Sequence, residues 1–300
     1  MPLVMNLRKI WRLLKETISE WQFDEMSLLA SSLAYYTVFS LAPLMIIVIT
    51  IVGVIFGEAA TKGEIVGRIQ DLVGLEGARV IEMAIANMRE DNTENAFRLV
   101  FSFGFLLFGA SGVFAQIQNA LNKIWQVKPK PKPQVVHFLR KRFLSFAMVL
   151  VIAFLLLISL VVNTALAALT NYLSDFIPNL SSLLRLINFL VSFLAIVLLV
   201  GAMYAILPDA KVVWRDAFTG AIITAILFLL GQYLFGISIA QTEFGSAYGV
   251  AGSFVIIITW LYYTAHILFL GAEFTKVYAR KHGSPIVPES HAISISQEKL

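Results

Sequence analysis

The sequence contains no cysteine, and only 14% of its 300 residues are charged. Without cysteine, the chain has no disulfide framework, no thiolate ligands for zinc and no thiol nucleophile. This absence fits an oxidising and a reducing compartment equally well. With 58% hydrophobic residues, the composition is too apolar for a soluble domain of this size. The composition therefore predicts a membrane protein.

The sequence also lacks the motifs of several enzyme classes. No HxxxH, DxD or GxxxxGKS/T pattern occurs. A ribonuclease needs a metal-binding carboxylate cluster or a general acid–base pair, and ATP hydrolysis needs the glycine-rich phosphate loop. We therefore expect no nuclease activity, no ATP hydrolysis, no metal site and no cofactor.

Six apolar runs are long enough to cross a bilayer, which takes a helix of about 20 residues. The runs cover residues 33–56, 99–117, 143–166, 186–207, 217–239 and 251–273. They predict an all-α fold in which residues 1–282 form one integral membrane domain, a six-helix bundle. We expect the polar residues 283–300 to form a disordered tail.

Two further segments have helical periodicity without being apolar enough to span. Near the N-terminus, apolar residues recur at helical spacing from Leu7 to Trp21. They predict an amphipathic helix that either lies on the cytoplasmic membrane surface or packs on its own protein. Residues 57–97 contain two apolar stripes separated by Gly74 and Gly77. They predict an extracytoplasmic helical hairpin.

Lysine and arginine are distributed unequally about the predicted spans. Among those near the spans, sixteen lie on the side of the two termini, and six lie on the other side. Because basic loops stay in the cytoplasm, both termini are predicted to be cytoplasmic. The basic stretch 123–142 could attract RNA. The tendency of basic loops to stay in the cytoplasm also explains this stretch, and its positive charge would attract anionic lipid. We therefore expect membrane lipids and no nucleic acid as partners.

The last predicted span carries polar side chains inside an apolar run. At about 100° per residue, Thr259, Tyr262, His266 and Glu273 lie on one face of the helix. In hydrocarbon each of these groups needs a partner, so the stripe should face other helices. His266 is either a proton or solute contact or a neutral histidine bonded to a neighbouring helix, and we favour the neutral histidine.

Small residues and edge charges indicate where helices meet. Glycines permit close helix packing, and the candidates are Gly109, Gly112, Gly245, Gly249 and Gly252. At the cytoplasmic end we expect a polar cluster made of Tyr35, Tyr36, Asn122, Trp125, Arg215, Asp216 and Glu273. We expect an Arg215–Glu273 contact at its centre, because arginine offers a planar fork that pairs with a carboxylate at the membrane edge.

Five motif groups follow one another along the chain. They are Ser32-Leu-Ala-Tyr-Tyr36 with Ser40-Leu-Ala-Pro43, Ala120-Leu-Asn-Lys-Ile-Trp125, Leu207-Pro-Asp209 with Trp214-Arg-Asp216 and Gly220, Ala247-Tyr-Gly249 with Gly252, and Trp260-Leu-Tyr262 with Leu270-Gly-Ala-Glu273. This ordered set, over residues 25–280, resembles the YihY/virulence factor BrkB family. The resemblance implies a bacterial inner-membrane protein of six spans. It implies no settled activity, and the family's former name, ribonuclease BN, is regarded as a misassignment.

The sequence favours transport or handling of a small or amphipathic solute, and a lipid is one such solute. The alternative is a non-transporting scaffold for the cell envelope, and a membrane-bound ribonuclease is disfavoured. A polar, water-reachable cleft near the stripe would favour transport, whereas a dry, tightly packed interior would favour the scaffold. The substrate, the direction of transport and the oligomeric state, including a homo-oligomer, are left open.

Overall fold

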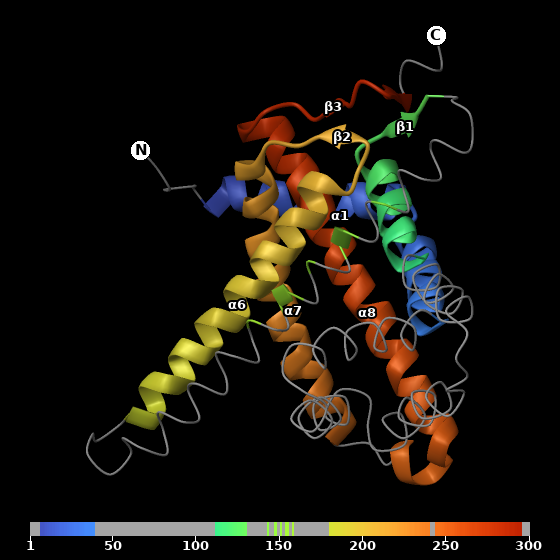
Figure 1. The fold of residues 1–300 in the computed structure, drawn as a ribbon, viewed down its shortest axis with the longest axis vertical. Coiled ribbons are helices and arrows are strands. Elements are labelled where there is room, and N and C mark those ends of the chain that lie inside the picture. The colour runs from blue at the N-terminus through green and yellow to red at the C-terminus, as the bar shows by residue number, and fades with distance from the viewer. Residues whose placement is uncertain are drawn as a thin grey trace, which may run out of the picture.

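The fold is described from a computed structural model, which places residues 7–39, 112–130, 180–240 and 244–295, with isolated residues between 143 and 158. The expected hairpin over residues 57–97 and most of the first three expected spans lie outside these residues. The described part is mostly helical, and its few strands are short (Figure 1).

Three long helices dominate the described part: α6 (Leu180–Ile206), α7 (Trp214–Ala240) and α8 (Phe244–His282). Each contains a stretch that is long and apolar enough to cross a membrane. They correspond to the last three predicted spans. α8 is longer than the predicted span 251–273, because it begins at Phe244, includes Gly245 and Gly249 and ends at His282. Each glycine costs a helix about 1 kcal/mol, but no proline interrupts this segment.

Helices α7 and α8 cross through two glycines and two threonines. The hydroxyl of Thr224 donates to the carbonyl of Gly220 at 2.9 Å, and that of Thr275 donates to the carbonyl of Gly271 at 2.8 Å. A Cβ at Gly220 would lie 1.7 Å from Thr275 Oγ1, and a Cβ at Gly271 would lie 1.7 Å from Thr224 Oγ1. Each threonine therefore packs over the glycine of the other helix, which lets the two backbones approach closely.

Tyr204 ties α6 to this crossing. Its ring is fully buried and packs edge-on against Trp125, with ring centroids 6.1 Å apart. Its hydroxyl donates to the carbonyl of Leu268 and lies 3.0 Å from Thr224 Oγ1. A buried tyrosine hydroxyl needs such partners. The contact fixes α6 against both neighbouring helices.

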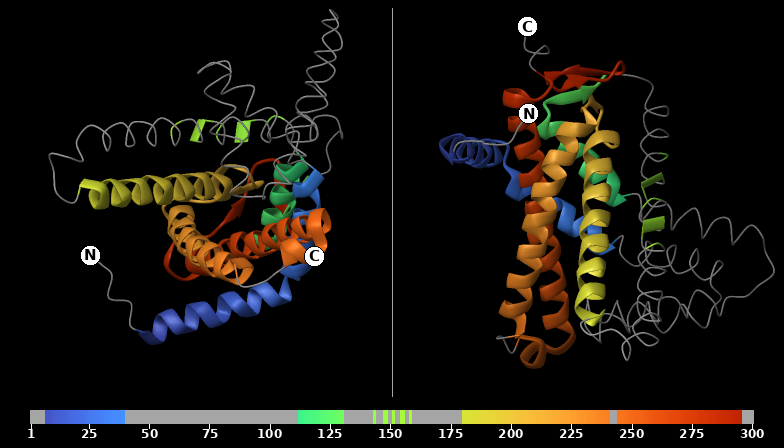
Figure 2. Two further views of the ribbon diagram at one scale, coloured as in Figure 1. Left: turned by 90° about the horizontal axis from the view of Figure 1, so that it is seen from below. Right: turned by 90° about the vertical axis from the view of Figure 1, so that its left-hand side faces the viewer.

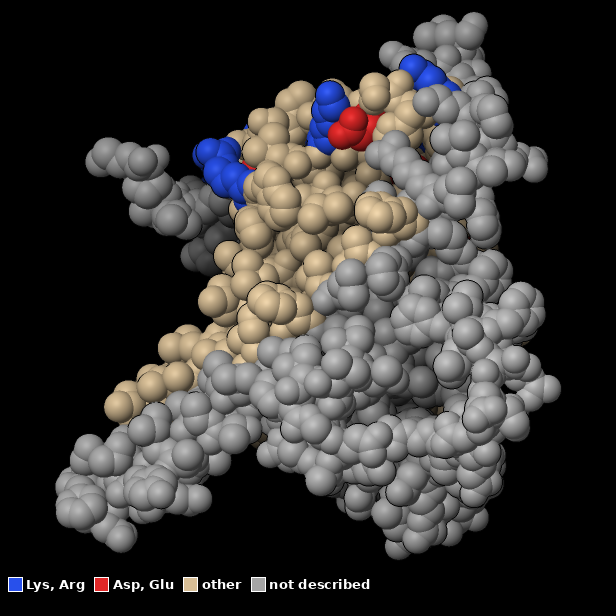
Figure 3. All heavy atoms as spheres, in the orientation of Figure 1, with Lys and Arg blue, Asp and Glu red and all other residues tan. Residues whose placement is uncertain are grey.

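Helix α1 (Leu7–Phe23) lies across one end of α8 rather than along it (Figures 1 and 2). A turn at Asp24 and Glu25 leads from α1 into the helix Met26–Phe39. On the face drawn in Figure 3, the charged side chains of the described residues gather at this same end, and the described surface below them is uncharged. This distribution is typical of a membrane protein whose charged end lies in the headgroup region or in water.

Short strands cover this end of the helices, which we call the capped end. β1 (Val127–Pro129) pairs antiparallel with β4 (Ala292–Ser294), and β2 (Ala210–Lys211) pairs antiparallel with β3 (Val287–Pro288). Our prediction of a disordered tail over residues 283–300 is therefore wrong for residues 283–295. The tail is ordered because it completes two strand ladders, whose backbone groups would otherwise lack partners.

The glycine–threonine crossing predicts that Gly271→Ala destabilises the protein. The new methyl group would meet Thr224 and the Tyr204 hydroxyl, and such overpacking costs about 1–3 kcal/mol. Gly236 on α7 is the control, since nothing lies within 4 Å of a Cβ there. Gly236→Ala should be neutral or stabilise the helix by up to about 1 kcal/mol. Thermal unfolding in detergent measures both, and equal melting temperatures would contradict the close crossing.

Candidate functional site at the capped end

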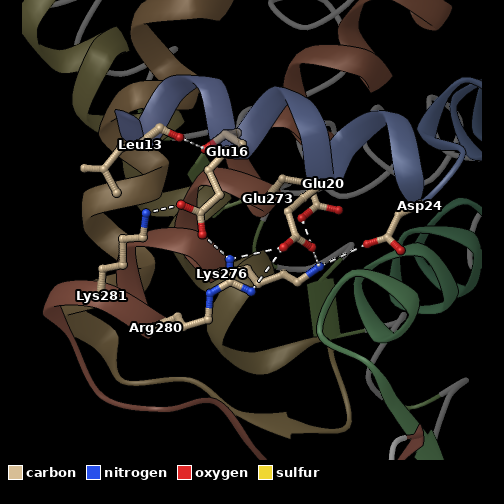
Figure 4. A network of polar contacts seen from close by, with 9 residues as sticks. Leu13, Glu16, Glu20, Asp24, Glu273, Lys276, Arg280 and Lys281 are labelled. Atoms are coloured by element: carbon tan, nitrogen blue, oxygen red, sulfur yellow. Dashed lines mark hydrogen bonds and ion pairs between the residues drawn. The ribbon is translucent and has the colours of Figure 1, made fainter. Parts of the chain in front are cut away.

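The acidic face of α1 pairs with the basic end of α8 (Figure 4). Glu16 and Glu20 are four residues apart, so they share one face of α1. Glu16 contacts both Arg280 and Lys281. Glu20 lies 3.1 Å from Arg280. These contacts join segments that are about 260 residues apart in the sequence.

Lys276 is the centre of this contact. Its Nζ lies 2.9 Å from Glu20, 3.0 Å from Asp24 and 3.3 Å from Glu273. The three carboxylates offer oxygens within 4.8 Å of one another, a spacing that a cation could bridge. The ammonium of Lys276 provides positive charge at that position. We call Glu20, Asp24, Glu273 and Lys276 the lysine knot.

Glu273 is the most deeply placed member of the lysine knot. Its side chain is 0% exposed, and its Oε1 has no hydrogen-bond partner among the described residues. Lys276 is the cation within contact distance of it there. A buried carboxylate either keeps a cation beside it or takes up a proton. Lys276 supplies positive charge next to Glu273, and it also holds Asp24 and Glu20 of α1.

The two outer carboxylates of α1 are held in their charged form. The hydrogen bond from Lys281 lowers the pKa of Glu16 below its ordinary value of 4.5, and Arg280 adds to this effect against the opposing effect of burial. Burial would raise the pKa of Glu20, but Lys276 and Arg280 outweigh burial and the pKa lies below 4.5. Both groups therefore stabilise the docked α1 above that pH, and this contribution is lost as the pH falls through the lowered pKa values.

The predicted Arg215–Glu273 contact is wrong. Arg215 has a side chain that is 74% exposed, and its Nε lies 3.7 Å from Asp216. Glu273 instead contacts Lys276, one turn along the same helix. The acidic face of α1 holds Lys276 in place. The partner that the sequence analysis missed is therefore α1 itself.

A second buried polar centre surrounds Asp209, directly after α6. Asn122 Nδ2 donates to Asp209 Oδ2 at 2.8 Å, and the Asp209 amide donates to Asn122 Oδ1 at 2.8 Å. His291 Nε2 lies 2.8 Å from Asp209 Oδ1. Asp209 thus connects the helix over residues 112–124, the loop after α6 and the tail. The sequence analysis identified Asn122 but missed Asp209 and His291, although Asp209 stood in the Leu207-Pro-Asp209 motif.

Asp216 fixes the start of the tail. It lies in the first turn of α7, where the helix dipole favours a carboxylate. Its Oδ2 accepts a hydrogen bond from the amide of Ser284 at 2.9 Å. A Cβ at Gly283 would lie 2.2 Å from the same oxygen, so only glycine fits there. This buried carboxylate holds the tail against α7.

The other predicted members of the polar cluster occupy different surroundings. Trp125 is buried against Tyr204. Tyr35 and Tyr36 are exposed, and their rings contact each other and not the lysine knot. The structure therefore buries Asn122, Trp125, Asp216 and Glu273 at the capped end and leaves Tyr35, Tyr36 and Arg215 on the surface.

The predicted polar stripe of α8 divides into two parts. Thr259 is exposed and donates to the carbonyl of Val255 in its own helix. The ring of His266 lies 4.4 Å from that of Tyr262 and 5.1 Å from that of Trp21 on α1. Nδ1 of His266 has no hydrogen-bond partner among the described residues. Among the described residues, His266 is thus held by aromatic rings, and the interhelical hydrogen bond that we favoured is not found there.

The predicted packing glycines are not those of the observed crossing. Gly245, Gly249 and Gly252 lie in the first turns of α8, Gly112 begins the helix over residues 112–124, and Gly109 lies outside the described residues. Their role in close packing stays a prediction. Gly220 and Gly271 form the crossing instead, and the glycine–threonine spacing of four residues in both helices was the signal for it.

An apolar cavity of about 260 Å³ lies within the bundle. The helix Met26–Phe39, the helix over residues 112–124, α6, α7 and α8 all line it. Its walls are almost entirely hydrocarbon, with Val200 and Ala265 among them, and the hydroxyl-bearing residues are three threonines. Thr264 is one of the three, and its buried hydroxyl has no partner among the described residues.

A family model described as virulence factor BrkB matches residues 17–294. The chain belongs to the BrkB virulence-factor family. A UPF0761 membrane protein of Cronobacter sakazakii is 28% identical over 280 residues, which cover 91% of this chain and 88% of the relative. The membrane protein Ent638_4092 of an Enterobacter species is 33% identical, and YihY of Salmonella newport is 31% identical.

For these two relatives the match covers 66% of this chain and 62% of theirs. No solved structure matches the chain. The resemblance to the YihY/BrkB family is thus confirmed, and the names of these relatives state that they are membrane proteins. Membership of this family and the membrane class are therefore established, and the described residues are mostly helical.

The lysine knot predicts unequal effects of two lysine substitutions. Lys276→Met should cost about 3–5 kcal/mol of stability, because it removes the cation from the buried carboxylate of Asp24 and from Glu20. Lys281→Met is the matched control on the same helix, since its pair with Glu16 is partly exposed and worth about 0.2–1 kcal/mol. Denaturant unfolding of both variants gives the comparison. Similar losses from the two substitutions would show that Lys276 does not hold the carboxylates of α1 against α8.

Proposed function

We propose that this protein binds and moves an amphipathic lipid-like solute at the bacterial inner membrane, with the apolar chain of the solute in the cavity. The apolar cavity between five helices is the observation that carries the proposal. The described side chains line this space without filling it, whereas close packing is the rule in protein interiors.

The size and the lining of the cavity support an apolar chain as its occupant. Its volume of about 260 Å³ exceeds the roughly 150 Å³ that accepts benzene in an engineered protein cavity. It is close to the lower limit of about 300 Å³ for ordinary ligand pockets. The unpartnered hydroxyl of Thr264 offers one polar contact in an otherwise apolar wall. A hydrocarbon chain that ends in, or carries, a polar group matches this arrangement.

The position of the cavity suits a solute with a polar head. Ala265 and Leu268 on α8 line the cavity, and Glu273 and Lys276 follow on the same helix. From Leu268 to Glu273, a rise of about 1.5 Å per residue separates the two levels by about 7.5 Å. A chain in the cavity would therefore place its polar part near the charged capped end.

The orientation is part of the proposal. The described segments with the basic residues that we expect in the cytoplasm, residues 123–130, 211–215 and 276–281, lie at the capped end. Their arrangement supports an inner-membrane protein whose termini are both cytoplasmic. The envelope scaffold is the alternative function, and it would be favoured by an interior that holds no solute.

Filling the cavity tests the proposal. Val200→Phe on α6 places a larger side chain in the cavity, and Leu198→Phe, which is exposed on the same helix, is the matched control. If the new ring excludes two methylene groups of the lipid chain from the cavity, the lipid should bind about tenfold more weakly, because each buried methylene contributes about 0.8 kcal/mol. Native mass spectrometry of the purified protein with added phosphatidylglycerol measures retention. Lipidomics of a deletion strain that carries each variant measures activity in the cell.

We expect the wild type and Leu198→Phe to retain lipid and to restore the lipid profile, and Val200→Phe to do neither. Equal retention by Val200→Phe and the wild type would place the lipid elsewhere. If the protein retains no lipid and the deletion strain has an unchanged lipid profile, solute handling is wrong and the envelope scaffold is favoured.

A further inference from the structure

Helix α1 has three faces with different surroundings. One face carries Leu13 and Thr17, which are buried, together with the acidic residues that contact α8. A second face is apolar and exposed: Trp11 is 71% exposed, and Leu14 and Ile18 are also exposed. The docking to α8 therefore leaves a large apolar surface of α1 open.

The third face of α1 is basic. Arg8, Arg12 and Lys15 follow at helical spacing, so they share one side of the helix, next to the apolar face. All three are exposed, and none has an ion-pair partner among the described residues. Their charge is therefore available to a partner, in contrast to the basic residues of α8.

The ion pairs with α8 set the rotation of α1 about its own axis. Glu16, Glu20 and Asp24 recur every four residues and point to Lys281, Arg280 and Lys276. If α1 turned by a third of a revolution, these carboxylates would lose their cations. The exposed apolar face and the basic face are thus presented in a fixed direction.

The placement of α1 matches the level of the membrane surface. α1 runs across the long helices, and its N-terminal part projects away from them (Figure 2). It contacts the last turns of α8, where the spanning helix reaches its basic end. A helix at this level, oriented across the spans, lies parallel to the bilayer and at headgroup depth.

We propose that the open side of α1 binds the anionic cytoplasmic leaflet, with Trp11, Leu14 and Ile18 inserted between lipids and Arg8, Arg12 and Lys15 at anionic headgroups. Tryptophan prefers this depth, and each basic residue near an anionic surface adds to the attraction. A bilayer fits better than a protein partner, because the exposed face combines an apolar strip with an unpaired row of one charge. α1 is then a membrane-bound arm that the ion pairs connect to the end of α8.

The absence of cysteine makes a direct test possible, since one introduced cysteine gives one label. An environment-sensitive fluorophore is attached at one of two exposed positions. These are Ile18→Cys on the apolar face and Ser19→Cys on the neighbouring basic face. The full chain is reconstituted in phosphatidylcholine vesicles with and without phosphatidylglycerol, and doxyl-labelled lipid is the quencher. We expect strong quenching and a blue shift at position 18, little at position 19, and an increase at position 18 with phosphatidylglycerol.

Charge reversal separates headgroup attraction from a general charge effect. Arg12→Glu with Lys15→Glu should make the quenching at position 18 independent of phosphatidylglycerol. The ratio of membrane-inserted α1 to free α1 should fall about tenfold or more. Lys211→Glu with Arg215→Glu makes the same change of charge at the capped end, on β2 and α7 instead of α1, and should have little effect. The thermal stability of each variant shows that the protein is folded.

Equal quenching at both positions, or a signal that does not depend on phosphatidylglycerol and on Arg12 and Lys15, would overturn the proposal. Efficient disulfide cross-linking of Ile18→Cys between two copies, without lipid quenching, would also overturn it and would assign this face to a second copy of the chain.

Discussion

Lys276 joins the acidic face of α1 to the end of the membrane helix α8. Glu273 has Lys276 as its cation within the described residues, and Lys276 is shared with Glu20 and Asp24 of α1. Breaking one partner of a buried ion pair costs about 3–5 kcal/mol, which is a large part of the stability of an ordinary domain. The docking of α1, its rotation and the surface that it presents all depend on this contact.

The remaining polar centres join the same end of the bundle. Asp209 connects Asn122 to His291, and Asp216 holds the start of the tail. Deeper in the bundle, the glycine–threonine crossing and Tyr204 fix α6, α7 and α8 next to the cavity. A rigid, charged end and an apolar interior space are thus built on the same helices. This combination supports a solute whose head and chain differ in polarity.

The sequence predicted the features that depend on local pattern. The lengths of the apolar runs located all three of α6, α7 and α8, because the bilayer thickness sets the span length, and three of the six helix ends lie within three residues of the prediction. The same reasoning failed where the partner is distant in the sequence. Arg215 was paired with Glu273 because both lie at one end, but α1 supplies the acidic residues that hold Lys276 in place, about 250 residues away.

No sequence pattern predicted the order of the tail, since strands of two or three residues are too short to show hydrophobic periodicity. The helical crossing had a signal that was not used. Gly220 and Thr224 on α7, and Gly271 and Thr275 on α8, repeat one spacing, but only their register across the two helices shows that they interlock.

The docking of α1 through ion pairs is the central claim, and its pH dependence tests it most directly. Spin labels at Ser19→Cys on α1 and Lys211→Cys on β2 report the distance between the two elements, and labels at Tyr233→Cys on α7 and Phe254→Cys on α8 serve as the control pair. Since the pKa values of Glu16 and Glu20 are lowered below 4.5, the docked state keeps its ion pairs above that pH. We predict one narrow distance at neutral pH that broadens as the pH falls below 4.5, while the control pair stays unchanged. A distance from α1 that stays narrow through this range, or that is already broad at neutral pH, would contradict the account.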